Sequence, residues 1–135
     1  MTASSTELIE AIRFGHFAEK GHTNRAFGKR IVLEIKKALL AGKIHGGDSF
    51  PTVQKLSDEL MIPAKSAFQV ISILMSEGVL EIQEGVGSVI KGIPPPSPLL
   101  RSAFLSDEVE HFAVEARFLG LKEADVIDAL RANWM

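Results

Sequence analysis

The segment from Val79 to Gly92, VLEIQEGVGSVIKG, constrains the fold of this chain more than any other part of its sequence. Apolar and polar residues alternate in VLEIQ and again in SVIKG, which is typical of strands with one buried face. The intervening EGVG holds two glycines, which favour the backbone conformations of a tight turn. The segment therefore predicts an antiparallel β-hairpin.

A long amphipathic helix is predicted well before this hairpin. It runs from Asn24 to Ala41, and Gly42 is placed to end it. Apolar residues recur along one helical face, at Ile31, Val32, Ile35, Leu39 and Leu40. The face predicts a helix that packs against a core.

Two further helices, joined by a short turn, are predicted between the first helix and the hairpin. Thr52 can cap the second helix, and Met61–Ile62 make the turn. The third helix begins at about Pro63 and stops at Gly78. The inward residues of the two helices are Leu56, Leu60, Ala67, Val70, Ile71 and Leu74. Helix, helix–turn–helix and hairpin together predict an α+β winged helix–turn–helix domain over residues 24–92.

The stretch GIPPPSPL predicts a proline-rich linker over residues 93–100, because four prolines fix an extended backbone and remove its donors. Two helices are predicted after this linker, which form a tail over residues 101–135. The first runs from about Ser102, or from Pro98 at the end of the linker, to Leu119, and the second runs from about Lys122 to Asn133. Two amphipathic helices alone make a poor domain, so we expect them to pair with the same helices of a second chain. The residues expected in this interface are Leu105, Val109, Phe112, Ala116, Leu119, Ile127, Leu130 and Trp134.

Residues 1–23 form an amino-terminal extension. A short helix from Ser4 to Phe14 is predicted there, because Ser4 and Glu7 have the spacing of a capping box. The extension has no basic start followed by an apolar run, so we expect no signal peptide. No window approaches the roughly 18 apolar residues of a membrane span. These features predict a cytoplasmic protein.

The composition limits the chemistry that the chain can perform. It has no cysteine, which excludes disulfides, thiol catalysis and zinc–thiolate sites. The net charge is −2, yet residues 20–92 carry ten Lys/Arg against seven Asp/Glu. The basic residues are therefore concentrated in the predicted winged domain, although they do not form a polybasic run.

The predicted winged domain resembles the GntR-type DNA-binding domain of bacterial transcription regulators. The resemblance covers about 60 residues, LEIKKALLAGKIHGGDSFPTVQKLSDELMIPAKSAFQVISILMSEGVLEIQEGVGSVI. The shared positions are Gly42, Gly47, Asp48, Pro51, Thr52, Leu56, Leu60, Leu74, Glu77, Gly78, Gly85 and Gly87. The tail, with EARFLGLKEADVIDAL, resembles the short YtrA-type subfamily, whose two carboxy-terminal helices mediate dimerisation. The resemblance implies a transcriptional regulator, typically a repressor, that binds a near-palindromic operator on double-stranded DNA as a homodimer and needs no cofactor.

This chain lacks the arginines that the family usually carries at its DNA contacts. Gln54 stands near the start of the second helix, and Ala64 and Phe68 stand on the third. Before and between the glycines of the wing, the chain has Ile82, Gln83 and Val86. Two alternatives therefore stay open: a winged-helix module that binds proteins with weak or lost DNA readout, and a regulator that responds to a metal or a small molecule held by the tail.

The candidate DNA contacts are polar residues and glycines on the second helix, the third helix and the wing. They are Thr52, Gln54, Lys55, Lys65, Ser66, Gln69, Gly85, Gly87 and Lys91. Gln69 has the donor and acceptor that pair with adenine, and Lys65 suits a phosphate or a guanine. Phe68 would either contact a thymine methyl or pack into a core or interface, which is the commoner role of an aromatic side chain.

Other chemistry finds little support in the sequence. Asp107, His111 and Glu115 are spaced at four residues on one helix, where a histidine between carboxylates can bind a divalent metal. An ordinary solvent-exposed helix flank is the commoner meaning of this pattern. No glycine loop opens a helix to hold a phosphate, and no serine has a recognisable base partner. The sequence therefore predicts a protein that is not an enzyme.

Overall fold

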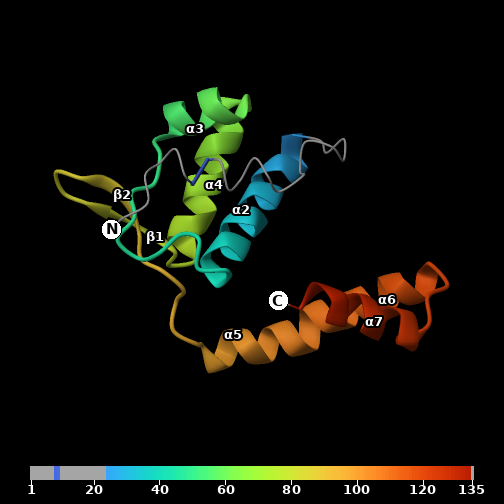
Figure 1. Cartoon of the computed structure of the whole chain (residues 1–135). Helices are drawn as coiled ribbons and strands as arrows, with labels where there is room; N and C mark the ends of the chain where they lie inside the picture. Colours follow the sequence, from blue (N-terminus) through green and yellow to red (C-terminus); the bar gives the residue numbers. More distant parts are fainter. Residues whose placement is uncertain (1–7, 10–23, 135) are drawn as a thin grey trace. The chain divides into compact units, whose positions relative to one another are not determined.

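The computed structural model describes residues 8–9 and 24–134 and divides the chain into two compact units, Met1–Pro94 and Pro95–Met135 (Figure 1). Apart from residues 8–9, the amino-terminal extension and the short helix expected there lie outside the described residues. Leu8 and Ile9 are helical and are buried in the core of the first unit. The resemblance to the winged domain did not include this contribution to the core.

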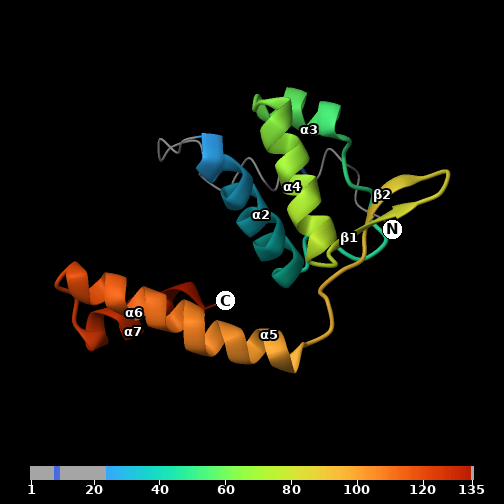
Figure 2. The same ribbon diagram turned by 180° about the vertical axis from the view of Figure 1, so that it is seen from behind.

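Three helices form the body of the first unit: α2 (Asn24–Leu40), α3 (Val53–Leu60) and α4 (Ala64–Ser76). Helices α2 and α4 lie side by side in both views of the fold (Figures 1 and 2). The apolar faces predicted from the sequence fill the space between the three helices. The core residues there include Ile31, Ile35, Leu56, Val70 and Leu74. Leu40 was expected beside the buried face of α2, but it is largely exposed at the last residue of the helix.

The wing is a two-stranded antiparallel hairpin of β1 (Leu80–Gln83) and β2 (Gly87–Ile90). The strands pair from Leu80 with Ile90 to Gln83 with Gly87. Leu80 and Ile90 are buried at the base of the hairpin, whereas Ile82 is exposed towards its tip. Only the base of the wing therefore belongs to the core.

The connection from α2 to α3 contributes a short third strand-like segment to the wing. Ser49 forms a bridge with Val89. The Gly47 N–H donates to the Ile90 carbonyl at 2.7 Å, and the Ile90 N–H donates back to the Asp48 carbonyl at 2.9 Å. The sequence analysis predicted no strand in this connection, where two adjacent glycines, Gly46 and Gly47, are typical of a turn.

The second unit is a helical hairpin. Helix α5 (Pro98–Ala103) continues through a π-helical turn (Phe104–Glu108) into α6 (Val109–Phe118), and α7 (Glu123–Asn133) returns. Ser97 caps α5 by accepting from the Leu100 N–H at 3.2 Å. Gly120, at φ 75°, ends the helical path between α6 and α7, at the boundary between the two helices predicted from the sequence. No helix among the described residues is long and apolar enough to cross a membrane.

Candidate nucleic-acid interface

The turn between α3 and α4 sets the angle at which α4 is presented. Met61 ends α3 in the left-handed conformation, at φ 53°. The Ser57 hydroxyl donates to the Ile62 carbonyl at 2.6 Å, and the Ile62 N–H donates to the Ser57 carbonyl at 3.1 Å. These bonds fix the helix–turn–helix, because they satisfy backbone groups that the end of α3 would otherwise leave open.

Helix α4 buries one face and exposes the other. The buried residues are Ser66, Ala67, Val70, Ile71 and Leu74. The exposed ones on its first three turns are Ala64, Lys65, Phe68, Gln69 and Ser72. The exposed face is the surface that α4 can offer to a groove of DNA.

Ser66 is a correction to the sequence analysis, which placed it on the outward face. It retains only 4% of its accessible surface. Ser66 precedes Val70 by four residues, and Val70 precedes Leu74 by four, so the three lie on one helical row. Because Val70 and Leu74 are fully buried, this row faces the core and Ser66 cannot contact DNA in the present structure.

Gln69 remains exposed, but its side chain lies against α2. A methyl group added at Gly28 would stand 2.5 Å from the Gln69 Oε1 atom. The amide of Gln69 thus occupies the space that the absent side chain of Gly28 leaves free. The amide lies along α2 and does not project straight from α4. The spacing of residues within α4 could not predict this contact with another helix.

The candidate contacts on α3 are largely committed to local hydrogen bonds. Thr52 caps α3 as predicted, and its Oγ1 accepts from the Lys55 N–H at 3.1 Å. The Gln54 Nε2 donates to the Asp58 Oδ1 at 2.8 Å. Among these side chains, Lys55 is the exposed cation that can face a phosphate.

The wing presents a glycine-containing turn and little positive charge. Gly85 and Gly87 have φ values of 79° and 106°, which a residue with a side chain rarely adopts. Val86 between them is exposed, and the Gln83 amide donates to the Glu81 carboxylate at 3.1 Å. Lys91 lies at the base of the wing, where its N–H donates to the Val79 carbonyl at 2.7 Å.

Acidic residues outnumber basic ones on these elements. The segment from Thr52 to Lys91 carries Lys55, Lys65 and Lys91, but also Asp58, Glu59, Glu77, Glu81 and Glu84. Three cations of α2 form ion pairs within the domain: Arg30 with Glu34 at 3.0 Å, Lys37 with Glu34 at 3.5 Å, and Lys36 with Glu77 at 2.9 Å. Electrostatic attraction to a phosphate backbone is therefore modest.

Exposed apolar side chains distinguish this surface. Met61 at the turn is 91% exposed and Phe68 on α4 is 63% exposed, and Ile82 and Val86 on the wing are also exposed. The sequence analysis named Phe68 and Val86 as departures from the family pattern but gave no signal for Met61. Phe68 therefore does not pack into the core of this chain.

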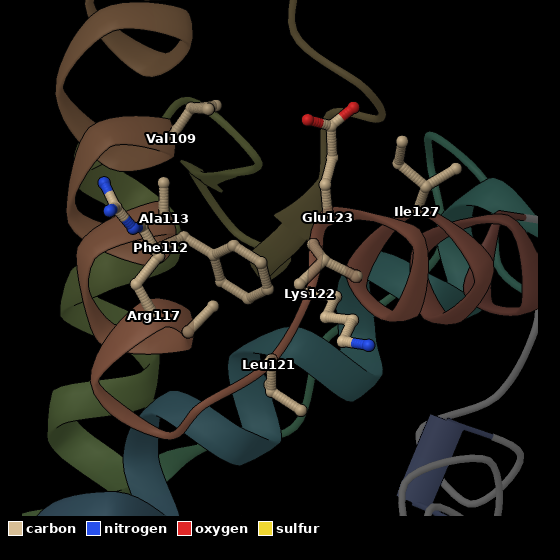
Figure 3. A pocket seen from close by; sticks show the side chains of 10 residues that line it. Val109, Phe112, Ala113, Arg117, Leu121, Lys122, Glu123 and Ile127 are labelled. Atoms are coloured by element: carbon tan, nitrogen blue, oxygen red, sulfur yellow. The ribbon is translucent and has the colours of Figure 1, made fainter.

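The interface residues predicted for the tail lie on the second unit, mostly in contact with solvent. Ala116 is buried, whereas Leu105, Val109, Phe112, Leu119, Ile127, Leu130 and Trp134 are exposed. Helices α6 and α7 enclose an open cleft of about 480 Å³ (Figure 3). The ring of Phe112 points into this cleft, and Leu121 and Ile127 line it as well.

The candidate metal ligands do not converge. Among the residues that the structure describes, no three His, Asp or Glu side chains are grouped closely enough to hold an ion. Asp107 and Glu115 are eight residues apart, which separates them by about 12 Å along a helix axis. Asp107 also belongs to the π-helical turn, so the α-helical spacing that suggested the site does not apply to it.

The fold and this surface define a winged helix–turn–helix domain, the architecture that presents the second helix of its helix–turn–helix, here α4, to the major groove of DNA. Residues 27–90 match the model of the family described as "Bacterial regulatory proteins, gntR family". These residues form a GntR-family domain, and the chain therefore carries the DNA-binding domain of a GntR-type transcriptional regulator. The resemblance stated from the sequence is confirmed at the level of the family.

Solved structures share the fold at low sequence identity. A transcriptional antiterminator from Listeria monocytogenes EGD-e aligns with a TM-score of 0.67 and 15% identity, covering 78% of this chain and 79% of its own. A GntR family transcriptional regulator from Listeria monocytogenes aligns with a TM-score of 0.54 and 17% identity, covering 85% of this chain and 98% of its own. No curated protein matches the sequence.

Proposed function

We propose that the chain is a homodimeric transcriptional regulator, a repressor of the YtrA type, which binds a near-palindromic operator in the cytoplasm. The observation that carries the proposal is the GntR-family domain followed by a helical unit with an exposed apolar surface. Two copies related by a two-fold axis would present two α4 helices to half-sites about 34–36 Å apart, or a multiple of that distance.

The exposed side chains of the tail support dimerisation. Leu105, Phe112, Leu130 and Trp134 all keep more than half of their accessible surface. Large apolar patches are uncommon on monomers, because leaving them in water forfeits the free energy of burial. A second copy of the same helices covers such a patch in a closed two-fold assembly.

DNA binding by this domain is expected to depend less steeply on salt than binding by a protein with more cations at its DNA surface. Lys55, Lys65 and Lys91 are the cations available on α3, α4 and the wing. The slope of log affinity against log salt is about −0.9 for each neutralised phosphate. Three contacts in each copy therefore predict a slope near −5 for the dimer.

The test is a salt series with a duplex from the chain's own promoter region and a random duplex of equal length, followed by fluorescence anisotropy. Selective binding of the promoter duplex, with the shallow slope above, is the expected result. An intact dimer that binds neither duplex at 50 mM salt would refute the proposal.

A second candidate function is a winged-helix module that binds protein. The exposure of Met61, Phe68, Ile82 and Val86 favours it, because apolar side chains occupy the surface where phosphate-binding cations are usual. Absence of DNA binding by a folded dimer is the result that would favour this function over the first.

A further inference from the structure

The exposed face of the first two turns of α4 carries an apolar row beside Lys65. Ser66 faces the core, and the Gln69 amide lies over Gly28 of α2. Ala64 and Phe68 remain on the exposed face, four residues apart and therefore one above the other. Both belong to the first two turns of α4, the part of a recognition helix that contacts base edges.

In the major groove the apolar group on a base edge is the C5 methyl of thymine. A phenyl ring against guanine would cover the N7 and O6 acceptors without replacing their bonds to water, which is unfavourable. A phenyl ring against the thymine methyl removes apolar surface from water on both sides. A phenyl ring that reaches base edges would therefore discriminate between bases by the burial of apolar surface.

We propose that Phe68, supported by Ala64, selects thymine by contacting its C5 methyl group in each operator half-site. The inference rests on the proposed function, since it assigns a role in DNA binding. A protein partner could also cover Phe68, but Lys65 beside it and the GntR-family domain that holds it favour DNA.

The experiment compares thymine with uracil, which pairs in the same way but lacks the methyl group. A duplex is first selected by the dimer from a randomised library at low salt. It is then synthesised with deoxyuridine replacing thymidine, one position at a time and at symmetric positions of both half-sites. We expect about fourfold weaker binding for the loss of one contacted methyl and about fifteenfold for the symmetric pair, the values for burial of one and two methyl groups.

The variant Phe68→Ala tests the assignment to this residue. It should bind the thymine and uracil duplexes with affinities within a factor of about 1.5, whereas Phe68→Leu should keep part of the preference. Leu40→Ala, which truncates an exposed apolar residue on α2, is the matched control and should retain the full preference. Thermal melting checks that the variants fold, which is expected because both side chains are mostly exposed.

The outcomes separate this inference from the proposed function. Equal binding of thymine and uracil duplexes by the unaltered protein would overturn the role of Phe68 and leave the DNA-binding function standing. A preference that survives in Phe68→Ala would overturn it as well, because another residue would then read the methyl. If no duplex is selected at all, the proposed function itself fails, and with it the inference.

Discussion

Phe68 stands on the exposed face of α4, where the choice between an arginine and a phenyl ring determines what the helix can recognise. An arginine forms two hydrogen bonds with guanine or an ion pair with phosphate. A phenyl ring does neither, and Lys65 is then the remaining cation on α4. At the scale of single residues, α4 therefore offers an apolar ring and one cation to a partner.

Phe68→Arg should add a cation that can bind a DNA phosphate. We expect tighter binding of random duplexes at low salt and a salt slope steeper by about 0.9 for each phosphate newly contacted by a copy. Leu40→Arg adds the same charge on an exposed part of α2 and should change neither quantity much. Anisotropy titrations from 50 to 200 mM salt measure both, on the scale over which such contacts change affinity. Identical slopes for Phe68→Arg and the unaltered protein would show that α4 does not approach DNA.

Asp48 is a buried carboxylate, 2% exposed, between α2 and the wing. Its Oδ2 accepts from the His45 N–H at 2.8 Å, which holds the turn that leads into the third strand-like segment. Asp48→Ala leaves that N–H without its acceptor and should lower the free energy of unfolding by about 1–3 kcal/mol.

Urea denaturation followed by circular dichroism measures the cost of Asp48→Ala. Asp58→Ala is the control, because it removes an exposed carboxylate whose partner Gln54 is exposed too. A surface substitution of this kind should change stability by no more than about 0.5 kcal/mol. Equal losses in the two variants would mean that the buried bond contributes little to the fold.

At the scale of elements, local sequence patterns were sufficient for α2, α3, α4 and the hairpin, because each has its own periodicity and end signals. Thr52 caps α3 and Gly120 separates the tail helices, both at the expected positions. Features that depend on distant parts of the chain were missed. The placement of Gln69 depends on a glycine in α2, and the pairing of Ser49 depends on β2.

The spacing of apolar residues in the tail does not predict its π-helical turn. The stripe from Leu105 to Leu119 fits an uninterrupted α-helix, yet Phe104–Glu108 adopts the wider turn. The Ser106 hydroxyl donates to the Ser102 carbonyl at 3.0 Å within this turn. Because such bonds compete with the helical ladder, a serine can accompany a local change of helix geometry.

The packing of the wing against the α2–α3 connection predicts a strong effect of a small substitution. A methyl group at Gly46 would stand 2.8 Å from the backbone carbonyl oxygen of Lys91. Gly46→Ala must therefore displace the end of β2, at a cost of about 1–3 kcal/mol. We expect faster hydrogen exchange at the amides of Gly47 and Ile90, whose bonds tie the connection and the wing together.

Gly42→Ala provides the comparison for Gly46→Ala. Gly42 has φ 73° and no atom within 4 Å of an added methyl group, so its replacement causes backbone strain without a contact. Both variants should be destabilised, but only Gly46→Ala should accelerate exchange at the wing. Unchanged protection of the Gly47 amide in Gly46→Ala would contradict the proposed coupling between connection and wing.

At the scale of the whole molecule, the affinity for an operator depends on how many copies of the chain bind it together. A recognition surface with few cations binds one half-site weakly. Joining two copies makes the second half-site contact intramolecular, which can raise affinity by 10²–10⁴-fold. In the proposed dimer, the tail helices would thus compensate for the modest electrostatics of the winged domain.

Phe112→Asp should separate the two copies, because it places a charge in the apolar cleft between α6 and α7 (Figure 3). We expect a monomer in sedimentation equilibrium and operator binding at least about 100-fold weaker, with about half the salt slope. The control His111→Asp adds a carboxylate to the neighbouring, exposed position of α6, off the apolar stripe, and should remain a dimer. A Phe112→Asp dimer would place the interface elsewhere on the chain. A Phe112→Asp monomer with undiminished operator affinity would instead show that one winged domain is sufficient for recognition.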